Sequence, residues 1–505
     1  MPLRDGFLAI DIGTQSSRAA ILTAEGETLT LVSRPHSMAT PRPGWAEQNP
    51  EHWWEATVDN VRDVLSQSDG RVGIAAVAVC GQMHGTVPVA RDGTALTPAV
   101  QLWCDKRAAG IAEEISAAHD PAALMGMAGN IPTAAWSGFK MAWMRRYQPE
   151  IYDQAWAILT PKDFVNLRLT GEIGTDRTEA SGSFLMDVQS AEWSSTLIAL
   201  LGLEAEKLPA IHASSDIIAG VSVEASRQTG LPSGTPVVAG SGDMLALLLG
   251  TGITAPGIAC DISGTASIVS FHAGAPVTDS RLMNLHATGP HWIAFGILDS
   301  GGGSLRWWRD QFMSDGAGGG DAIYDQMMSE AAAVPAGCEG LLFLPYLLGE
   351  RTLGSAASRG VFFGFHPRHG RAHATRAILE GICFDLRQSL EIAREAGIPV
   401  NEMRTGGGGA RSEFWSGIKA DVYALPVAAI EHEEAGILGA AMLAMVGAGV
   451  FPSESAAAAH LVRPREGIEP DVEAIAVYDR HYRLFRTLHD RLQSVYREAA
   501  VMLSA

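Results

Sequence analysis

An aspartate at position 243 stands at the end of an apolar run that closes in small residues. Residues 237–244 read Val-Val-Ala-Gly-Ser-Gly-Asp-Met, which is typical of a buried strand followed by a turn. Ligand sites in α/β sheets gather at the carboxyl ends of strands, so Asp243 could accept a proton from a substrate hydroxyl. The alternative is a helix N-cap, a position that aspartate also favours. Taken alone, the segment favours the cap.

A second candidate is a turn rich in glycine and hydroxyl residues near the start of the chain, between apolar runs at 7–12 and 18–23. Backbone N–H groups and hydroxyls in such a turn can bind phosphate oxygens. Asp11, just before the turn, could hold magnesium, usually through water. A plain hairpin turn is the alternative. The residues concerned are Gly13, Thr14, Gln15 and Ser16.

This turn has an echo in the middle of the chain. The run Asp-Ile-Gly-Thr-Gln-Ser-Ser at 11–17 returns as Asp-Ile-Ser-Gly-Thr-Ala-Ser at 261–267. Both copies stand between apolar runs, and both have anion-binding chemistry, so Gly264 and Thr265 form a second candidate phosphate loop. A repeat at this separation indicates a duplicated domain. We expect two domains, at 1–250 and 251–505.

A glycine run at 406–409 is the candidate nucleotide loop. An apolar segment leads into it, and a helical pattern follows to Tyr423. Glycines between a strand and a helix let a ligand approach the backbone closely. Neither the dinucleotide spacing G-x-G-x-x-G nor the P-loop pattern occurs here. A flexible loop is the alternative. The candidate binding residues are Gly407, Gly408, Gly409 and Ala410.

Polar groups also follow the apolar run at 74–79, where the chain reads Cys-Gly-Gln-Met-His-Gly. Gln82 and His84, flanked by glycines, could donate and accept hydrogen bonds to a polyhydroxylated ligand. A lone histidine is more often structural than functional. The segment therefore only suggests a sugar site.

The elements that must position these residues are those of an α/β protein. Short β-branched runs alternate with helical patterns, and the helix expected at 375–396 has apolar residues at four-residue spacing before a stop at Gly397. A second amphipathic helix is expected at 474–500. The apolar run at 435–451 is short for a membrane span and carries four glycines, so we expect a buried core helix.

Charge and cysteine content narrow the class of partner. The net charge of −19 repels nucleic acid and anionic lipid, so we expect neither nucleic acid nor a membrane as partner. The five cysteines are scattered and form no C-x-x-C pair, which suits a reducing cytosol and predicts a cytoplasmic protein. The residues do not indicate an oligomeric state, and a homodimer is one option.

Several runs, taken together, resemble the FGGY family of carbohydrate kinases, and within it the xylulokinase branch. The resemblance covers residues 8–450 and implies an actin/hexokinase-type fold, in which two ribonuclease-H-like domains flank a deep cleft. It also implies that sugar binds the first domain and ATP mainly the second. The runs are Trp45–Pro50 with Trp53 and Trp54, Gln82–Gly85, Leu159–Asp163, Phe343–Thr352, Gly360–Gly364 and Gly407–Ser412.

The resemblance implies roles for the candidate residues. Asp243 matches the catalytic base, Asp11 the magnesium-associated aspartate, and the two turns the phosphate loops. The glycine run matches the adenosine motif. The implied reaction is transfer of the γ-phosphoryl group of ATP, with magnesium, to a small sugar, most simply D-xylulose. The residues implied in sugar binding are Gln82, Met83, His84, Trp103, Asp105 and Asp243.

Two departures from the family pattern leave the sugar open, and a third concerns phosphate binding. Met244 replaces an amide after the catalytic aspartate, and Cys104 replaces an asparagine between Trp103 and Asp105. Ala266 alters the second phosphate loop, which keeps Gly264. Loss of one hydrogen-bonding side chain can change sugar preference strongly. Ribulose, L-xylulose and erythritol are alternative substrates. A non-catalytic sugar or nucleotide sensor and an actin-like ATPase are alternative functions, against which the aspartates and the residues at 82–85 speak.

Overall fold

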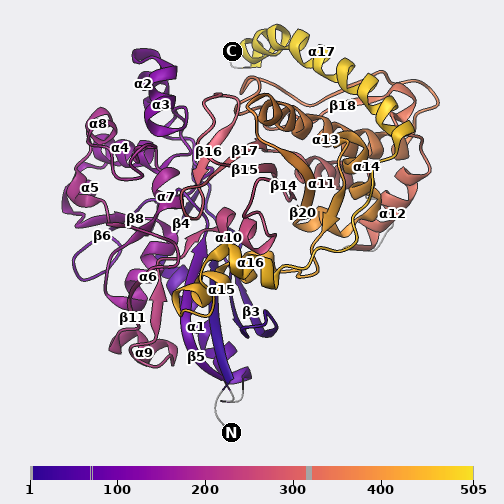
Figure 1. The fold of residues 1–505 in the computed structure, drawn as a ribbon. Helices are drawn as coiled ribbons and strands as arrows, with labels where there is room; N and C mark the ends of the chain where they lie inside the picture. The colour runs from indigo at the N-terminus through magenta and orange to yellow at the C-terminus, as the bar shows by residue number, and fades with distance from the viewer. Residues whose placement is uncertain (1–3, 69, 71, 314–320, 504–505) are drawn as a thin grey trace.

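The structure is a computed structural model that describes residues 4–68, 70, 72–313 and 321–503 of the chain (Figure 1). Two sheets form the centres of its two halves. The N-terminal sheet has the strand order β11-β12-β5-β1-β2-β3, with β13 paired to β5. Its strands are β1 Arg4–Ile12, β2 Ser16–Leu22, β3 Thr28–Pro35, β5 Val72–Gly81, β11 Ile217–Gly220, β12 Pro236–Val238 and β13 Ser241–Gly242.

The second sheet repeats this arrangement with the order β16-β17-β15-β14-β20-β21. In each sheet a central strand, β1 or β14, pairs antiparallel with the next strand and parallel with a later one, β5 or β20. The predicted fold of two ribonuclease-H-like domains is confirmed by this shared topology. The strands are β14 Gly257–Ser263, β15 Ser267–Ala273, β16 Met283–His286, β17 Trp292–Leu298, β20 Val400–Gly406 and β21 Val427–Ala429.

The sequence echo lies at equivalent places in the two sheets. Asp11 stands near the end of β1, and Asp261 stands in β14. Each precedes a turn that leads into the antiparallel neighbour, β2 or β15. Both central strands are buried over most of their length.

Helix α13, Arg371–Glu395, packs against the second sheet and buries the predicted apolar stripe. It ends as expected, since Gly397 adopts a φ of +81°. It begins four residues before the predicted start, because residues 371–374 complete a first turn that carries no apolar stripe. The C-terminal pattern forms helix α17, Val472–Leu503, which is yellow in Figure 1.

The apolar run at 435–451 forms helix α15, Ala435–Gly447, which is buried nearly all round. It packs on β1, β5 and helix α10, Asp243–Gly250. A Cβ at Gly439 would lie 1.7 Å from the carbonyl oxygen of Ala246, so glycine is needed for this close approach. A late segment of the chain therefore covers the N-terminal sheet, as the gold helix beside the indigo strands shows (Figure 1). The division of the chain at residue 250 stays a prediction.

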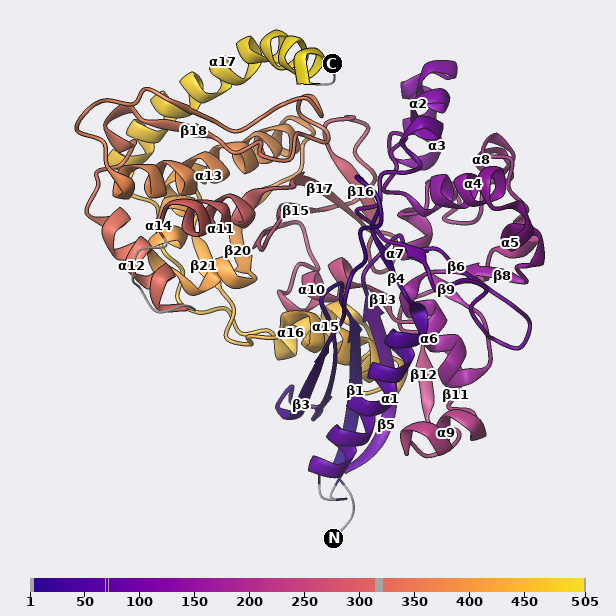
Figure 2. The ribbon, with the colours of Figure 1, turned by 180° about the vertical axis from the view of Figure 1, so that it is seen from behind.

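The remaining elements lie around the two sheets, with α2, α3, α4, α5 and α8 beyond the N-terminal sheet (Figure 2). Within the described residues, no helix combines the length and apolar composition that crossing a membrane requires. The further helices are α1 Pro50–Gln67, α2 Ala109–Ala118, α3 Pro121–Ala128, α4 Ser137–Tyr147, α5 Pro149–Gln154, α6 Pro161–Thr170, α7 Arg177–Ser181, α8 Ser195–Leu200, α9 Val223–Thr229, α11 Gly301–Phe312, α12 Asp321–Ala332, α14 Glu413–Tyr423 and α16 Glu454–Leu461.

Candidate active site

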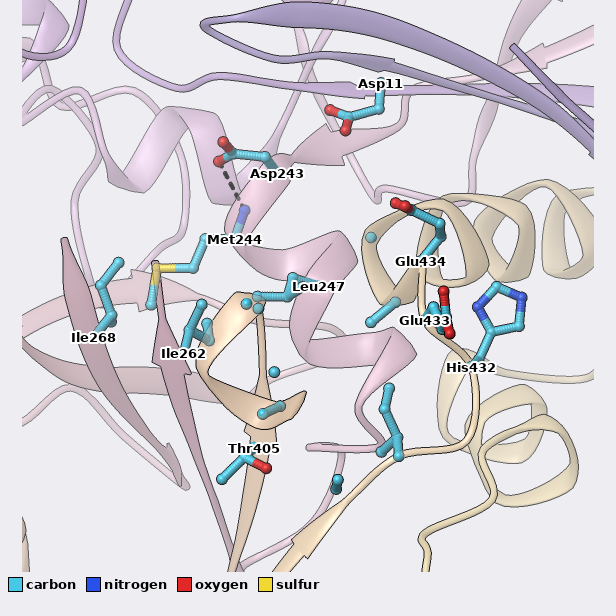
Figure 3. A pocket seen from close by; sticks show the side chains of 18 of the residues that line it. Asp11, Asp243, Met244, Leu247, Ile262, Ile268, Thr405, His432, Glu433 and Glu434 are labelled. Carbon is cyan, nitrogen blue, oxygen red and sulfur yellow. Dashed lines mark hydrogen bonds between the residues drawn. The ribbon is translucent and has the colours of Figure 1, made fainter. Parts of the chain in front are cut away.

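A cavity of about 620 Å³ lies between the two sheets. Its wall combines residues from the ends of β1 and β20, from the first turns of α10 and α15, and from β14 and β15 (Figure 3). Of the predicted site residues, the wall includes Asp11, Gly13, Asp243, Gly407, Gly408 and Ala410. Candidates from distant parts of the sequence thus meet in one place.

Asp243 is the first residue of α10, and the N-cap position belongs to Gly242. Its Oδ1 accepts a hydrogen bond from the N–H of Met244 at 2.8 Å (Figure 3). Although the side chain is exposed on the cavity side, protein surrounds it elsewhere. The resulting loss of hydration and then the negative charge of Asp11 raise the pKa of Asp243 to about 7. A carboxylate with that pKa can exchange protons near neutral pH.

Asp11 lies on the same side of the cavity as Asp243 (Figure 3) and is buried, with 4% of its surface exposed. Its Oδ2 is ion-paired with Arg18, which also pairs with Glu434 at the start of α15. Its Oδ1 has no hydrogen-bond partner among the described residues. Sequence reasoning missed Arg18 and Glu434. For Arg18 the available signal was a charged residue directly before the apolar residues 19–22 of β2. Nothing local marked Glu434.

Asp261 shows that the echo does not duplicate this chemistry. Its carboxylate accepts hydrogen bonds from Ser263, from Lys419 at 2.9 Å and from Tyr423 at 2.7 Å. It is fully buried, so its charge is compensated inside the second sheet. Asp11 keeps an unpartnered oxygen at the cavity, whereas Asp261 has a structural role.

The predicted nucleotide loop follows β20 as expected. Gly407 has a φ of +75°, and Gly408–Arg411 form a short 3₁₀ turn before α14. A Cβ at Gly408 would meet no atom within 4 Å, so backbone and open space face each other there. Gly409 differs, because its Cβ would lie 2.5 Å from Ser263 and 2.7 Å from the ring of Trp415. Gly409 is needed for packing, and Gly408 leaves room at the cavity.

The first turn is joined to the predicted sugar residues by hydrogen bonds. Thr14 Oγ1 donates to Gln82 Oε1 at 3.0 Å and accepts from Trp103 Nε1 at 3.1 Å. Gln48, which sequence reasoning missed, joins the same network, since Gln82 donates to its side chain at 2.8 Å. The amide of Gln82 and the hydroxyl of Thr14 thus hold one another in place. Thr14, Gln15 and Ser16 are not part of the cavity wall described above.

Met83 and His84, the next predicted sugar residues, are not part of this hydrogen-bond network. Met83 packs on Gly242, next to Asp243, because a Cβ at Gly242 would lie 2.6 Å from the sulfur of Met83. His84 has a φ of +65° and lies edge-on to Trp136 at 5.0 Å. Burial, and then the charges of Lys140 and Arg351, lower the pKa of His84 to about 3. His84 is therefore neutral near pH 7.

Two cations, Lys140 and Arg351, act on His84, and Asp105 acts on Lys140. The carboxylate of Asp105 accepts from the N–H of Ala46 at 2.7 Å and is ion-paired with Arg107 at 2.6 Å. Its oxygens are thus already bound within the protein. Burial lowers the pKa of Lys140 to about 7, although Asp105 opposes the shift. Arg351 reaches this region from the second half of the chain and pairs with Asp299 at 2.6 Å. Neither cation was predicted as a site residue.

The second predicted phosphate loop, at Gly264 and Thr265, lies outside the cavity wall. Thr265 Oγ1 accepts from Arg306 at 3.2 Å, and its carbonyl accepts from the N–H of Gly303 at 2.9 Å. Gly264 lies beside α11, since a Cβ on Gly302 would meet the carbonyl of Gly264 at 2.3 Å. Gly264 and Thr265 therefore lie next to the first turn of α11, and N–H groups at the start of a helix can bind anions.

The cavity suits a magnesium nucleotide by its chemistry. The unpartnered Oδ1 of Asp11 is the type of oxygen that Mg²⁺ binds. The open backbone at Gly408 is a place where a planar or phosphate group can approach closely. Asp11 and the residues at 407–410 are therefore those that would hold the two groups.

Comparison with known proteins gives matches over nearly the whole chain. Residues 7–250 match the N-terminal domain, and residues 261–448 the C-terminal domain, of the FGGY family of carbohydrate kinases. The chain is 30% identical to the xylulose kinase of Escherichia coli K12 (96% of this chain, 99% of the relative) and 29% identical to that of Bacillus subtilis 168 (95% and 96%). It is also 29% identical to the gluconokinase of Bacillus subtilis 168, over 88% of each chain.

A solved structure agrees with the sequence relatives. The xylulose kinase from Rhodospirillum rubrum is 29% identical and superimposes with a TM-score of 0.90, covering 97% of this chain and all of that one. With that coverage, the superposition includes both sheets.

Proposed function

The chain belongs to the FGGY family of carbohydrate kinases and is a sugar kinase, and we propose that it phosphorylates D-xylulose to D-xylulose 5-phosphate with Asp243 as general base. The single observation that carries the mechanism is the position of Asp243. Its carboxylate faces the cavity opposite the glycine loop, with a pKa raised to about 7. A base whose pKa lies near the working pH is substantially ionised and still has a strong driving force to accept a proton.

The chain's own groups account for three parts of the reaction. Asp243 accepts the proton of the sugar hydroxyl as that oxygen attacks the γ-phosphorus of ATP. The backbone at 407–408 leaves space for the nucleotide, and Asp11 would hold Mg²⁺ through its free oxygen. Mg²⁺ supplies charge neutralisation at the phosphoryl oxygens. Phosphoryl transfer depends mostly on positioning and electrostatic stabilisation, and these groups are of the types that supply both.

Asp11 needs a change of partner before it can bind a metal fully. Its Oδ2 is ion-paired with Arg18, which Glu434 also holds. Binding of a magnesium nucleotide would bring both a cation for Asp11 and anionic oxygens for Arg18. The pair Arg18–Glu434 keeps the guanidinium beside the cavity in either case.

D-xylulose is favoured as substrate by the relatives and by the loop at residues 83–84. The two xylulose kinases match over at least 95% of both chains. Met83 and His84 carry the xylulokinase pattern, and Met83 lies beside the turn that bears Asp243. A neutral His84 can donate and accept hydrogen bonds to hydroxyl groups.

D-gluconate is the second candidate, because a gluconokinase is as similar in identity as one of the xylulose kinases. Met244, at the position after the general base, also departs from the amide of the family pattern. A coupled assay for ADP decides between the sugars. The panel is D-xylulose, L-xylulose, D-ribulose, erythritol and D-gluconate.

We expect the highest kcat/KM for D-xylulose. A higher value for gluconate or for another member would overturn the choice of sugar while leaving the kinase intact. If calorimetry shows that the enzyme binds ATP but no member of the panel leads to ADP formation, the result would favour the non-catalytic sensor and refute the proposal.

A further inference from the structure

The strand that leads to Asp243 contains one extra residue. Val237 of β12 pairs with Val77 of β5, and Ser241 of β13 pairs with Cys80. Four residue steps along one strand, from 237 to 241, thus span the same distance as three steps along the other, from 77 to 80, which is the pattern of a β-bulge. The extra residue separates β12 from β13 at Ala239 and Gly240.

The bulge determines which way the end of the strand faces. Side chains alternate between the two faces of a strand, so a shift of one residue reverses every side chain that follows. Gly240 makes the bulge with a φ of +73°, and a Cβ there would lie 1.9 Å from the carbonyl oxygen of Val79. Only glycine is compatible with that approach. Asp243 comes three residues later as the first residue of α10, so the bulge sets the direction in which the chain enters that helix.

A bulge frees backbone groups that the sheet would otherwise bind. The N–H groups of Ala239 and Gly240 donate to the carbonyls of Asp216 at 2.8 Å and Ser214 at 2.9 Å. The carbonyl oxygen of Ala239 accepts from Asn166 Nδ2 at 2.9 Å and from Lys162 Nζ at 3.1 Å. Both donors come from α6, one turn apart on the same face of the helix.

Lys162 is itself held in place. It is fully buried and is ion-paired with Asp163, and with Asp176 Oδ1 at 3.1 Å. Asp176 in turn accepts from the N–H of Thr178 at 3.0 Å and from the hydroxyl of Ser214 at 3.0 Å. Because Ser214 also binds the bulge through its carbonyl, the charged cluster and the bulge form one connected, buried unit.

We propose that Asn166 and Lys162 are positioning residues for Asp243, which act by holding the carbonyl of Ala239 and thereby the bulge that aims the general base. The proposal rests on the proposed function in taking Asp243 as the base. Neither side chain contacts the cavity, so both act through the backbone at 239–243. Their effect belongs on the chemical step and not on the binding of sugar or ATP.

Asn166→Leu is the test variant, because it keeps the approximate size and removes the donor to Ala239. The Oδ1 of Asn166 has no partner within the described residues, so its removal leaves no donor unpaired. Lys162 is unsuited to this test, since its removal would leave two carboxylates buried without a cation. Thr170→Val is the matched control. Thr170 lies on the same helix and donates to the carbonyl of Asn166 at 2.7 Å, away from the bulge.

We expect Asn166→Leu to lower kcat by about 10- to 100-fold, the usual effect of a small misplacement of a catalytic group. KM for sugar and for ATP should stay within about twofold, since binding is not affected. Thr170→Val should lower the melting temperature to a similar extent without lowering kcat. An equal loss of kcat in both variants, or an unchanged kcat in Asn166→Leu, would overturn the proposal.

Amide hydrogen exchange separates this proposal from the proposed function. Exchange in the segment 237–247 should become faster in Asn166→Leu and stay unchanged in Thr170→Val, whatever the substrate is. Unchanged exchange in Asn166→Leu would refute the positioning role of Asn166 even if the enzyme is a xylulose kinase. Normal turnover of Asp243→Asn would refute the base assignment instead. If Asn166→Leu does not fold, Asn166→Ser, whose hydroxyl is too short to reach Ala239, is measured in the same way with the same expected results.

Discussion

The raised pKa of Asp243 predicts a specific pH dependence of turnover. A general base acts in its ionised form, so activity is present above its pKa and is lost as the pH falls through that value. With a pKa of about 7, roughly one in ten Asp243 side chains is ionised at pH 6 and roughly nine in ten at pH 8. An aspartate with the ordinary value of 3.8 would be almost fully ionised at both. We therefore expect kcat/KM to fall about tenfold from the plateau to pH 6.

The assay is the initial rate of ADP formation with the best sugar, between about pH 5.5 and about pH 8.5, with coupling enzymes in excess at each pH. Asp243→Asn should lower kcat by about 10²- to 10⁴-fold and remove the acid limb from whatever activity remains. The N-cap of α10 is Gly242, and asparagine at position 243 could still accept the hydrogen bond from the N–H of Met244. A purely structural Asp243 would therefore leave turnover near that of the wild type.

Asp385 supplies the control, because its pKa is also raised to about 7, by burial and then by the charge of Glu350. It lies in α13 and accepts from the hydroxyl of Tyr346 at 3.0 Å, a bond that asparagine can also accept. Asp385→Asn should keep the acid limb unchanged. A rate that is flat between pH 6 and pH 8 in the wild type, or a limb that disappears in Asp385→Asn and persists in Asp243→Asn, would refute the reasoning.

Three further outcomes follow from single residues. Gly408→Val should weaken ATP binding by about 1–3 kcal/mol in calorimetry, the usual cost of forcing methyl groups into space that another group, here the nucleotide, occupies. Sugar binding and the melting temperature should stay unchanged, because no protein atom outside the adjoining residues lies within 4 Å of the added Cβ. Lys162→Met should lower the free energy of unfolding in urea by about 3–5 kcal/mol, since it leaves buried carboxylates uncompensated; a smaller loss would mean that water reaches them. Asp11→Asn should raise the Mg²⁺ concentration needed for half-maximal rate, and an unchanged requirement in a magnesium titration would show that the metal is held elsewhere.

Local patterns were enough to predict the fold class and the main candidates. The alternation of strands and helices, the glycine run after β20 and the small-residue run before Asp243 are all short-range signals. The echo of residues 11–17 at 261–267 correctly indicated two similar sheets, because equivalent turns need equivalent residue types. The helix start at 371 was missed, since its first turn carries no apolar stripe.

The roles of two similar aspartates could not be told apart from sequence. Asp11 and Asp261 occur in nearly the same run of residues, but Lys419 and Tyr423, which lie about 160 positions later, satisfy Asp261. No comparable partner reaches the Oδ1 of Asp11 within the described residues. Sequence similarity specifies the turn, whereas charge compensation depends on which distant side chains the fold brings near.

The sequence by itself determined the residue types, the order of the elements and the position of Asp243 after a strand. Only the tertiary structure decided that this residue faces the cavity. Its direction depends on the bulge at Ala239 and Gly240, which Asn166 and Lys162 hold from another helix. A one-residue shift reverses the side chains of a strand, and what stabilises such a shift is contact between segments far apart in the chain. That is why the sequence left the direction of the Asp243 side chain open, whereas the fold defines it.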